Sequence, residues 1–258
     1  MRLARIAHPD GVAFASLDGD VDGGSATVHE IAEHPFGTPN HTGRSWPYDE
    51  VRLLAPILPT KIIAVGKNYA EHAAEFDSEV PETPVIFMKP NTSVTGPGAP
   101  IKLPASSTRV DFEGELAVVI GQPIRNVPAS KAPAAIRGYT IANDVTARDQ
   151  QRADGQWTRA KGYDSFCPLG PWIETDVDPA DLEIRTDVDG EVKQDSHTAK
   201  MVHTVPELVQ FVSHVMTLLP GDVILTGTPE GVGPITEGQS VSITVDGIGT
   251  LTNPVQAA

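Results

Sequence analysis

Short apolar runs separated by glycine, proline and aspartate predict a chain built mainly from β-strands. Two of these runs, at 61–66 and 112–120, contain stretches that are apolar throughout, which is typical of strands buried on both faces. Further strands are expected at 11–17, 26–31, 85–89, 138–143, 172–174, 182–188, 222–226 and 240–245. The pattern therefore predicts a mainly β fold.

Helices are expected to be fewer. The composition of 68–76 favours a helix, and others are expected at about 130–137 and 145–153. Residues 205–219 predict the longest one, because apolar side chains recur there at helical spacing. Its apolar face comprises Leu208, Val209, Val212, Val215, Met216 and Leu219.

Two regions of the chain differ in their pattern of apolar and turn residues. Residues 1–55 alternate short strand-like pieces with turn residues, which predicts a small N-terminal β appendage. Residues 56–258 carry the long buried runs and are expected to form the larger domain. Fixed-period repeats and low-complexity tracts are absent from the sequence.

Composition and charge exclude several classes of function. The 258 residues include 34 acidic and 19 basic side chains, a net charge of −15, which repels phosphate backbones and anionic lipid and makes nucleic acid an unsuitable partner. Cys167 is the only cysteine, so an internal disulfide and a multi-thiolate zinc site are excluded. Apolar runs of membrane-spanning length and a signal-peptide core are both missing, and we expect a cytoplasmic protein.

Three alternating carboxylates are the sharpest chemical feature. On a strand, Asp111, Glu113 and Glu115 would project from one face a few ångströms apart. Their repulsion is relieved either by water, on the solvated face of an edge strand, or by a cation. Oxygen ligands would select Mg²⁺, Mn²⁺ or Ca²⁺ rather than zinc.

A fourth carboxylate ends the next predicted strand. Asp144 closes the run at 138–143 and precedes a predicted helix. It could complete a carboxylate cage, or it could cap the helix N-terminus. Asp149 is expected on the helix surface.

Other polar residues are compatible with acid–base or anion-binding roles. His72 and Glu75 are three residues apart and share a helix face, so the carboxylate could orient a basic imidazole; a surface ion pair is the alternative. Lys161, in a turn-rich stretch, and Lys89, in a loop, could contact an anionic group of a substrate. Thr228 lies in the glycine-rich segment 221–234, which lacks the Gly-Lys-Ser/Thr ending of a phosphate loop but could hold a carboxylate.

Taken together, these segments resemble the fumarylacetoacetate hydrolase family over about residues 60–255. The matching motifs, in order, are GKNYAEHAAE (66–75), FMKP (87–90), DFEGEL (111–116), NDVTARD (143–149), KGYDSFCPLGP (161–171) and LTGTPEGVG (225–233). The resemblance implies a mixed β-sandwich or β-roll catalytic domain, usually in a homodimer. Residues up to about 55 resemble the small accessory domain of some members.

The resemblance also implies roles for particular residues. Glu113, Glu115 and Asp144 match the ligands of Mg²⁺ or Mn²⁺, whereas the role of Asp111 is left open. His72 and Glu75 match the catalytic dyad, and Lys161 matches a lysine that contacts the substrate. Arg148 and Thr228 fall in stretches that contact the carboxylate or 2-oxo group of the substrate.

The implied activity is that of a divalent-metal-dependent enzyme acting on small 2-oxo acids through a metal-stabilised enolate. Hydrolytic cleavage of acylpyruvates or decarboxylation of oxaloacetate is the leading hypothesis. Isomerisation of 2-hydroxyhepta-2,4-diene-1,7-dioate, a keto–enol tautomerisation, is the alternative, because a base that activates water also moves protons. A binding module that retains the metal site without catalysis is the second alternative.

Overall fold

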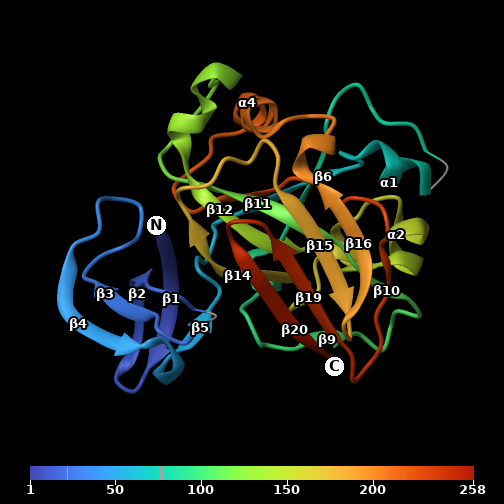
Figure 1. Ribbon diagram of the computed structural model, residues 1–258. Coiled ribbons are helices and arrows are strands. Elements are labelled where there is room, and N and C mark those ends of the chain that lie inside the picture. The colour runs from blue at the N-terminus through green and yellow to red at the C-terminus, as the bar shows by residue number, and fades with distance from the viewer. Residues whose placement is uncertain (22, 76–77) are drawn as a thin grey trace.

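The computed structural model describes residues 1–21, 23–75 and 78–258, and the chain is mainly β (Figure 1). A 12-stranded sheet has the order β4-β3-β2-β1-β14-β12-β11-β17-β6-β7, with β5 paired to β1 and β8 paired to β14. Its strands are β1 Arg2–His8, β2 Gly11–Asp18, β3 Thr27–Ile31, β4 His41–Pro47, β5 Arg52–Leu54, β6 Ile62–Gly66, β7 Val85–Lys89, β8 Val94–Thr95, β11 Gly114–Ile120, β12 Ile136–Asn143, β14 Cys167–Glu174 and β17 Val223–Leu225.

A second sheet of five strands packs against this one. Its order is β16-β15-β19-β20-β9, and its strands are β9 Ile101–Leu103, β15 Glu183–Val188, β16 Glu191–His197, β19 Ser240–Val245 and β20 Gly249–Ala257. One apolar cluster joins Leu116 and Ile141 of the large sheet to Ile184 and Ile243 of the smaller one. A third, three-stranded sheet consists of β10 Val110–Phe112, β13 Thr146–Ala147 and β18 Gly233–Pro234. The predicted fold class, a mixed β-sandwich, is confirmed.

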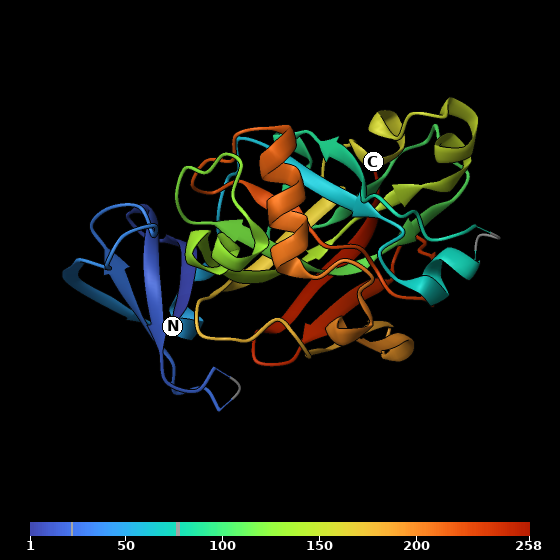
Figure 2. The ribbon, with the colours of Figure 1, turned by 90° about the horizontal axis from the view of Figure 1, so that it is seen from above.

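The N-terminal strands form a lobe set apart from the rest of the chain (Figure 2). The lobe continues the large sheet, because Leu3 pairs with Ile173 of β14. Its apolar cluster includes Ile6 and Leu17 and is closed by Trp172, again from β14. The division of the chain into domains 1–55 and 56–258 stays a prediction.

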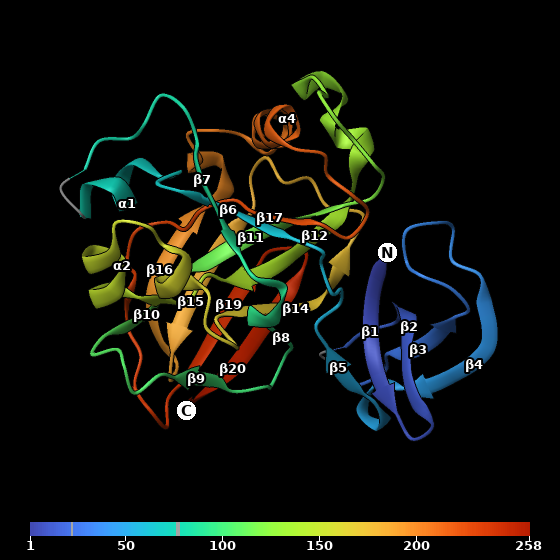
Figure 3. The same ribbon diagram turned by 180° about the vertical axis from the view of Figure 1, so that it is seen from behind.

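Helices lie on the sandwich surface. They are α1 Ala70–Glu75, α2 Arg148–Asp154, α3 Thr158–Lys161 and α4 Val205–Val215, with 3₁₀ helices η1 Tyr48–Glu50, η2 Asn91–Ser93, η3 Ala129–Ala135 and η4 Thr198–Lys200. Helix α4 starts at a capping interaction in which Thr204 N–H donates to the Glu207 carboxylate at 2.8 Å. Helices α1 and α2 lie at the same end of the molecule (Figures 1 and 3). In the described ranges, every helix is too short or too polar to cross a membrane.

The structure corrects several predicted elements. Residues 129–135 form a 3₁₀ helix containing Pro133, not the α-helix expected at 130–137, and β12 already begins at Ile136. Helix α2 begins three residues later than expected, because Thr146 and Ala147 pair with β10. Helix α4 ends at 215 rather than 219. Helix α1 accounts for 70–75 of the expected 68–76, and residue 76 lies outside the described residues. Strands β1, β4, β16 and β20 are not predicted by the sequence pattern.

The run 112–120 is interrupted rather than continuous. Strand β10 ends at Phe112 and β11 begins at Gly114, so Glu113 stands between two strands that belong to different sheets. Gly114 is required at this junction, since a Cβ there would lie 2.3 Å from the Thr186 hydroxyl oxygen of the opposing sheet. The break changes which side chains share a face, and that governs the geometry of the site.

Candidate active site

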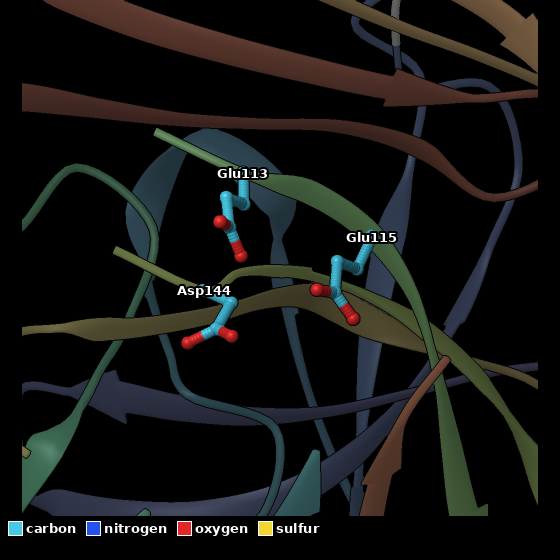
Figure 4. Close-up of side chains that lie close together, drawn as sticks. All are labelled: Glu113, Glu115 and Asp144. Carbon is cyan, nitrogen blue, oxygen red and sulfur yellow. The ribbon is translucent and has the colours of Figure 1, made fainter. Parts of the chain in front are cut away.

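Three carboxylates converge where β11 and β12 meet. Gly114 pairs with Asn143, and the Asp144 N–H donates to the Glu113 carbonyl at 2.9 Å. This antiparallel register places Asp144 beside Glu113 and Glu115. One carboxylate oxygen from each of the three residues lies within 4.8 Å of the other two. Figure 4 shows the three side chains close together. All three side chains are buried, so the alternative of a solvated strand face is wrong.

Buried cations surround two of the three carboxylates. Lys161 Nζ lies 2.8 Å from Glu113 Oε2 and 2.6 Å from Asp144 Oδ2, and Lys89 Nζ donates to Asp144 Oδ1. Arg148 Nη2 lies 2.6 Å from Glu113 Oε1. Although burial opposes ionisation, Lys161 and Arg148 hold the pKa of Glu113 below its usual value. Burial lowers the pKa of Lys161, but Asp144 and Glu113 outweigh it and raise the value overall.

Glu115 has a different environment. Its Oε2 accepts a hydrogen bond from Gly227 N–H at 2.7 Å, and among the described residues it forms no ion pair. Burial, reinforced by Asp144 and Glu113, raises the pKa of Glu115 well above its usual value. Gly227 has φ +96°, and a Cβ there would lie 2.8 Å from Asn68 Cβ, so only glycine presents its N–H in this way. Protonation of Glu115, or a cation bound beside it, would therefore relieve its buried negative charge.

The donor set fits a hard divalent cation. Glu113, Glu115 and Asp144 offer converging carboxylate oxygens, and burial together with Asp144 and Glu113 raises the pKa of Glu115. Oxygen-only donor sets suit Mg²⁺, Mn²⁺ or Ca²⁺, whereas zinc sites usually include nitrogen or sulfur. The alternative role of Asp144 as a helix cap is wrong, since Ala147 occupies the N-cap position of α2.

Asp111 does not join this cluster. Its carboxylate is held by two arginines, Arg109 Nε at 2.9 Å and Arg148 Nε at 2.9 Å. The expectation that Asp111 shares a face with Glu113 and Glu115 is wrong, because the strand break at Glu113 ends the alternation between them. Asp111 instead orients the guanidinium of Arg148.

The His72–Glu75 pair lies at the same site. His72 Nδ1 lies 3.1 Å from Glu75 Oε2, and Glu75 Oε1 accepts a hydrogen bond from Gly231 N–H at 2.7 Å. Helix α1 is thereby fastened to the glycine-rich loop that follows β17. Glu75 thereby orients the imidazole ring of His72 through Nδ1.

These groups line one cavity of about 180 Å³. Its walls are Val65, Gly66, Lys67, His72, Ala73, Ser78, Phe87, Glu113, Glu115, Asp144, Arg148, Gln151, Arg152, Trp157, Lys161 and Thr228. A larger hollow of about 560 Å³ lies between η3 and the start of α4, but none of the carboxylate triad reaches it. The smaller cavity is the candidate active site, because the titratable groups converge there.

Two predicted substrate contacts have other partners in the structure. Lys89 is buried against Asp144 and does not line the cavity, so the structure places it as a support of the carboxylate cluster. Thr228 lines the cavity, yet its hydroxyl donates to Gly114 O at 2.9 Å and accepts from Gln194 Nε2 at 2.8 Å. Lys161 is the last residue of α3 rather than part of a turn.

Sequence reasoning missed residues that shape this site. Gln194 is buried on β16, and its Oε1 accepts from Gly114 N–H at 3.0 Å, so it fixes the chain between Glu113 and Glu115. Trp157 and Phe87 form an aromatic wall, with ring centroids 5.1 Å apart in an edge-to-face contact. Nothing in the local sequence marks Gln194, whereas Phe87 lies in a motif already singled out.

Solved structures resemble the whole chain. A 5-carboxymethyl-2-hydroxymuconate delta-isomerase from Mycobacterium smegmatis is 65% identical with a TM-score of 0.95, and all of each chain is covered. A 2-hydroxyhepta-2,4-diene-1,7-dioate isomerase from Mycobacterium marinum is 64% identical with a TM-score of 0.94, covering 100% of this chain and 98% of the other. A maleylpyruvate hydrolase from Sphingobium sp. SYK-6, solved with manganese(II) and pyruvate, is 31% identical with a TM-score of 0.82 and full coverage of both chains.

Sequence comparisons agree with the structural ones. The mitochondrial oxaloacetate tautomerase Fahd2a of Rattus norvegicus is 42% identical over 221 residues, which cover 81% of this chain and 71% of the relative. The model of the fumarylacetoacetate (FAA) hydrolase C-terminal family matches residues 61–256, and that of the Rv2993c-like N-terminal family matches residues 1–56. With a family match over most of its length and enzymes among its relatives, the chain is an enzyme of the fumarylacetoacetate hydrolase family.

Proposed function

We propose that this protein is a divalent-metal-dependent isomerase that interconverts the keto and enol forms of small 2-oxo acids. The observation that carries the proposal is the position of one oriented base, His72, on the same small cavity as the carboxylate triad and Lys161. Two similar solved structures carry isomerase names, and a curated relative is named a tautomerase. Isomerisation, which the sequence analysis gives as the alternative to cleavage, is therefore the preferred function.

Glu113, Glu115 and Asp144 are the residues that would hold the ion. Once bound, Mg²⁺ or Mn²⁺ would act as a Lewis acid toward the carboxylate and keto oxygens of a 2-oxo acid. Lys161, which lies 2.6 Å from Asp144 Oδ2, fixes that carboxylate and adds positive charge next to the substrate oxygens. Arg148 does the same for Glu113.

His72 would carry the proton. In the keto-to-enol direction the C3–H bond breaks, His72 takes the proton, the C–H electron pair forms the C2–C3 double bond, and the π pair of the C2=O bond moves onto the oxygen. The proton is then returned to the C2 oxygen, so no atom is gained or lost. Glu75 holds Nδ1 of His72 and stabilises the imidazolium while it carries the proton. The reverse sequence converts enol to keto.

Cleavage is the second candidate function. The same dyad could activate a water molecule instead, and one similar structure is a maleylpyruvate hydrolase bound to manganese(II) and pyruvate. That structure is 31% identical, about half the identity of the isomerase-named structures. We therefore rank acylpyruvate hydrolysis and oxaloacetate decarboxylation below isomerisation.

The test follows three reactions of one purified, metal-stripped and reloaded sample. Ketonisation of enol-oxaloacetate is read by ultraviolet absorbance, carbon dioxide release reports decarboxylation, and release of acetate from acetylpyruvate reports cleavage. We expect ketonisation to have a kcat/KM at least tenfold above both others with Mg²⁺ or Mn²⁺, and to stop in EDTA. Faster cleavage or decarboxylation would reverse the ranking.

We further propose that the protein is a homodimer, as the family resemblance implies. Light scattering coupled to size-exclusion chromatography would report a mass near twice 27.4 kDa. A mass of a single chain would contradict this proposal without affecting the isomerase assignment.

A further inference from the structure

The cavity has a second charged end that the proposed chemistry does not use. Lys67, which follows β6, and Arg152 of α2 both line it. Within the described part of the chain, neither forms an ion pair with an acidic residue. Lys161, at the other end, is tied to two carboxylates. Arg152 is exposed and Lys67 half-buried, whereas the triad is buried, so these two cations mark the outer end of the cavity.

The backbone holds Lys67 in an unusual conformation. Its φ is +60°, a region that side chains other than glycine and asparagine rarely adopt. The next residue fixes it there: fully buried Asn68 donates to Thr226 O at 2.8 Å and to His203 O at 3.0 Å, and accepts from His203 N–H at 2.8 Å. Unfavourable backbone conformations persist where surrounding structure enforces them, often at functional sites. Here the enforced conformation places a lysine at the cavity.

The cavity also has an apolar wall. Phe87 and Trp157 line it, and Gly66 lies so close to the Trp157 ring that a Cβ would approach within 2.8 Å. A volume of about 180 Å³ is below the roughly 300–1,000 Å³ of pockets for drug-sized ligands. A short, flat carbon chain fits this space.

We infer that Lys67 and Arg152 form a subsite for a second carboxylate, which makes the enzyme selective for 2-oxo dicarboxylates over 2-oxo monocarboxylates. The inference rests on the proposed function, because it assigns the first carboxylate and the keto group to the triad end. Net charge supplies the physical reason: a chain of −15 repels a dianion, and two cations that pair with no acidic side chain among the described residues provide local attraction. Charge-assisted hydrogen bonds from both side chains would also orient the substrate.

The experiment compares oxaloacetate with its 4-methyl ester, which keeps the 2-oxo carboxylate and lacks the distal charge. Ketonisation is measured with Mg²⁺-loaded wild type, Lys67→Met, Arg152→Met and the control Lys131→Met, whose exposed lysine lies on η3. We expect wild type to prefer oxaloacetate at least tenfold in kcat/KM. Lys67→Met should lose about tenfold on oxaloacetate, mostly in KM, and Arg152→Met about threefold, since Arg152 is more exposed. The ester should change less than twofold in every variant.

Binding is measured separately by quenching of tryptophan fluorescence, because Trp157 lines the cavity. If wild type converts neither compound but binds oxaloacetate at least tenfold more tightly than the ester, and Lys67→Met removes that difference, the subsite stands and the proposed function fails. Equal losses on both compounds, or an unchanged preference for oxaloacetate in a variant that combines Lys67→Met with Arg152→Met, would overturn the subsite.

Discussion

The two walls of the cavity, the carboxylate wall and helix α1, are held in different ways. On the carboxylate wall, Glu113, Asp144 and Lys161 are at most 4% exposed and hold one another through direct ion pairs. Helix α1 has six residues; His72 and Glu75 contact each other within it, and Glu75 accepts a hydrogen bond from Gly231 N–H of the glycine-rich loop. Changes to the first wall should therefore affect folding and metal binding, whereas changes to the second should affect proton transfer.

The largest effect is expected from removing the base. His72→Ala should lower kcat for ketonisation by about 10²–10⁴-fold, the usual contribution of general acid–base catalysis. Metal affinity, measured by calorimetry, should stay within about twofold, because His72 is not part of the triad. Glu71→Gln, an exposed change on the same helix, is the control and should keep wild-type activity. A loss of metal binding in His72→Ala would contradict the division of metal binding and proton transfer between the carboxylate wall and helix α1.

The next effect concerns folding. Lys161→Met leaves Glu113 and Asp144 without a cation that both share, and breaking a buried ion pair typically costs about 3–5 kcal/mol. Urea unfolding in EDTA should show a loss of this size, and saturating Mn²⁺ should recover part of it. Lys131→Met controls for removal of an exposed lysine. If Lys161→Met unfolded at wild-type urea concentrations, the carboxylate wall would not depend on mutual pairing.

Two members of the triad should behave differently without metal. Glu113→Gln removes a buried charge that pairs with both Lys161 and Arg148 and leaves them only Asp144 and Asp111, so in EDTA it should destabilise the fold by about 3 kcal/mol. Glu115→Gln should leave stability unchanged or raise it, because burial beside Asp144 and Glu113 makes its negative charge unfavourable. The melting temperatures of the two variants in EDTA would distinguish these outcomes.

When metal is added, Glu113→Gln and Glu115→Gln should show the same defect in metal binding. Each should weaken Mn²⁺ binding by at least about 100-fold, since even residues that only support a ligand contribute 10–100-fold. Addition of Mn²⁺ should then raise the melting temperature of wild type and of neither variant. Wild-type affinity in Glu115→Gln would exclude this residue as a ligand.

The smallest effect is a pH dependence outside the cavity. Burial raises the pKa of Cys167 to about 12. Because the folded value exceeds the unfolded one of about 8.5, this thiol contributes stability that is complete below about pH 8.5 and is lost as pH rises toward 12. The loss approaches about 1.4 kcal/mol per pH unit. Wild type should therefore lose more stability than Cys167→Ala between pH 9 and 10 in urea titrations, and identical slopes would contradict the assignment.

Much of the fold could be predicted because the signal is local. Strands β7 and β19 match the expected ranges residue for residue. Leu208, Val209 and Val212 of the predicted apolar face of α4 are buried as expected, whereas Val215 and Leu219 are exposed. Exposed edge strands such as β4 were missed, because side chains with water on both faces need no alternating pattern. The 3₁₀ helix η3 was mistaken for an α-helix because its composition is similar.

The site was predicted in part. Glu113, Glu115, Asp144, His72 and Lys161 do line one cavity. Their roles remain predictions that the variants above would test. Lys89, by contrast, is bound to Asp144 and is not part of the cavity wall, and the sequence pattern assigns no role to Lys67 or Arg152. Local spacing could not separate these lysines, because their partners lie far along the chain.

The sequence by itself determined the buried strands, the excess of acidic charge and the carboxylates at the junctions of strands. Only the tertiary structure decided which carboxylates meet. A one-residue break at Glu113 sends Asp111 to the arginines, while the pairing of β11 with β12 brings Asp144 to Glu115. The physical reason is that side-chain periodicity reports on neighbours along one strand, whereas the position of a buried charge is set by partners such as Lys161, which is 48 residues from Glu113.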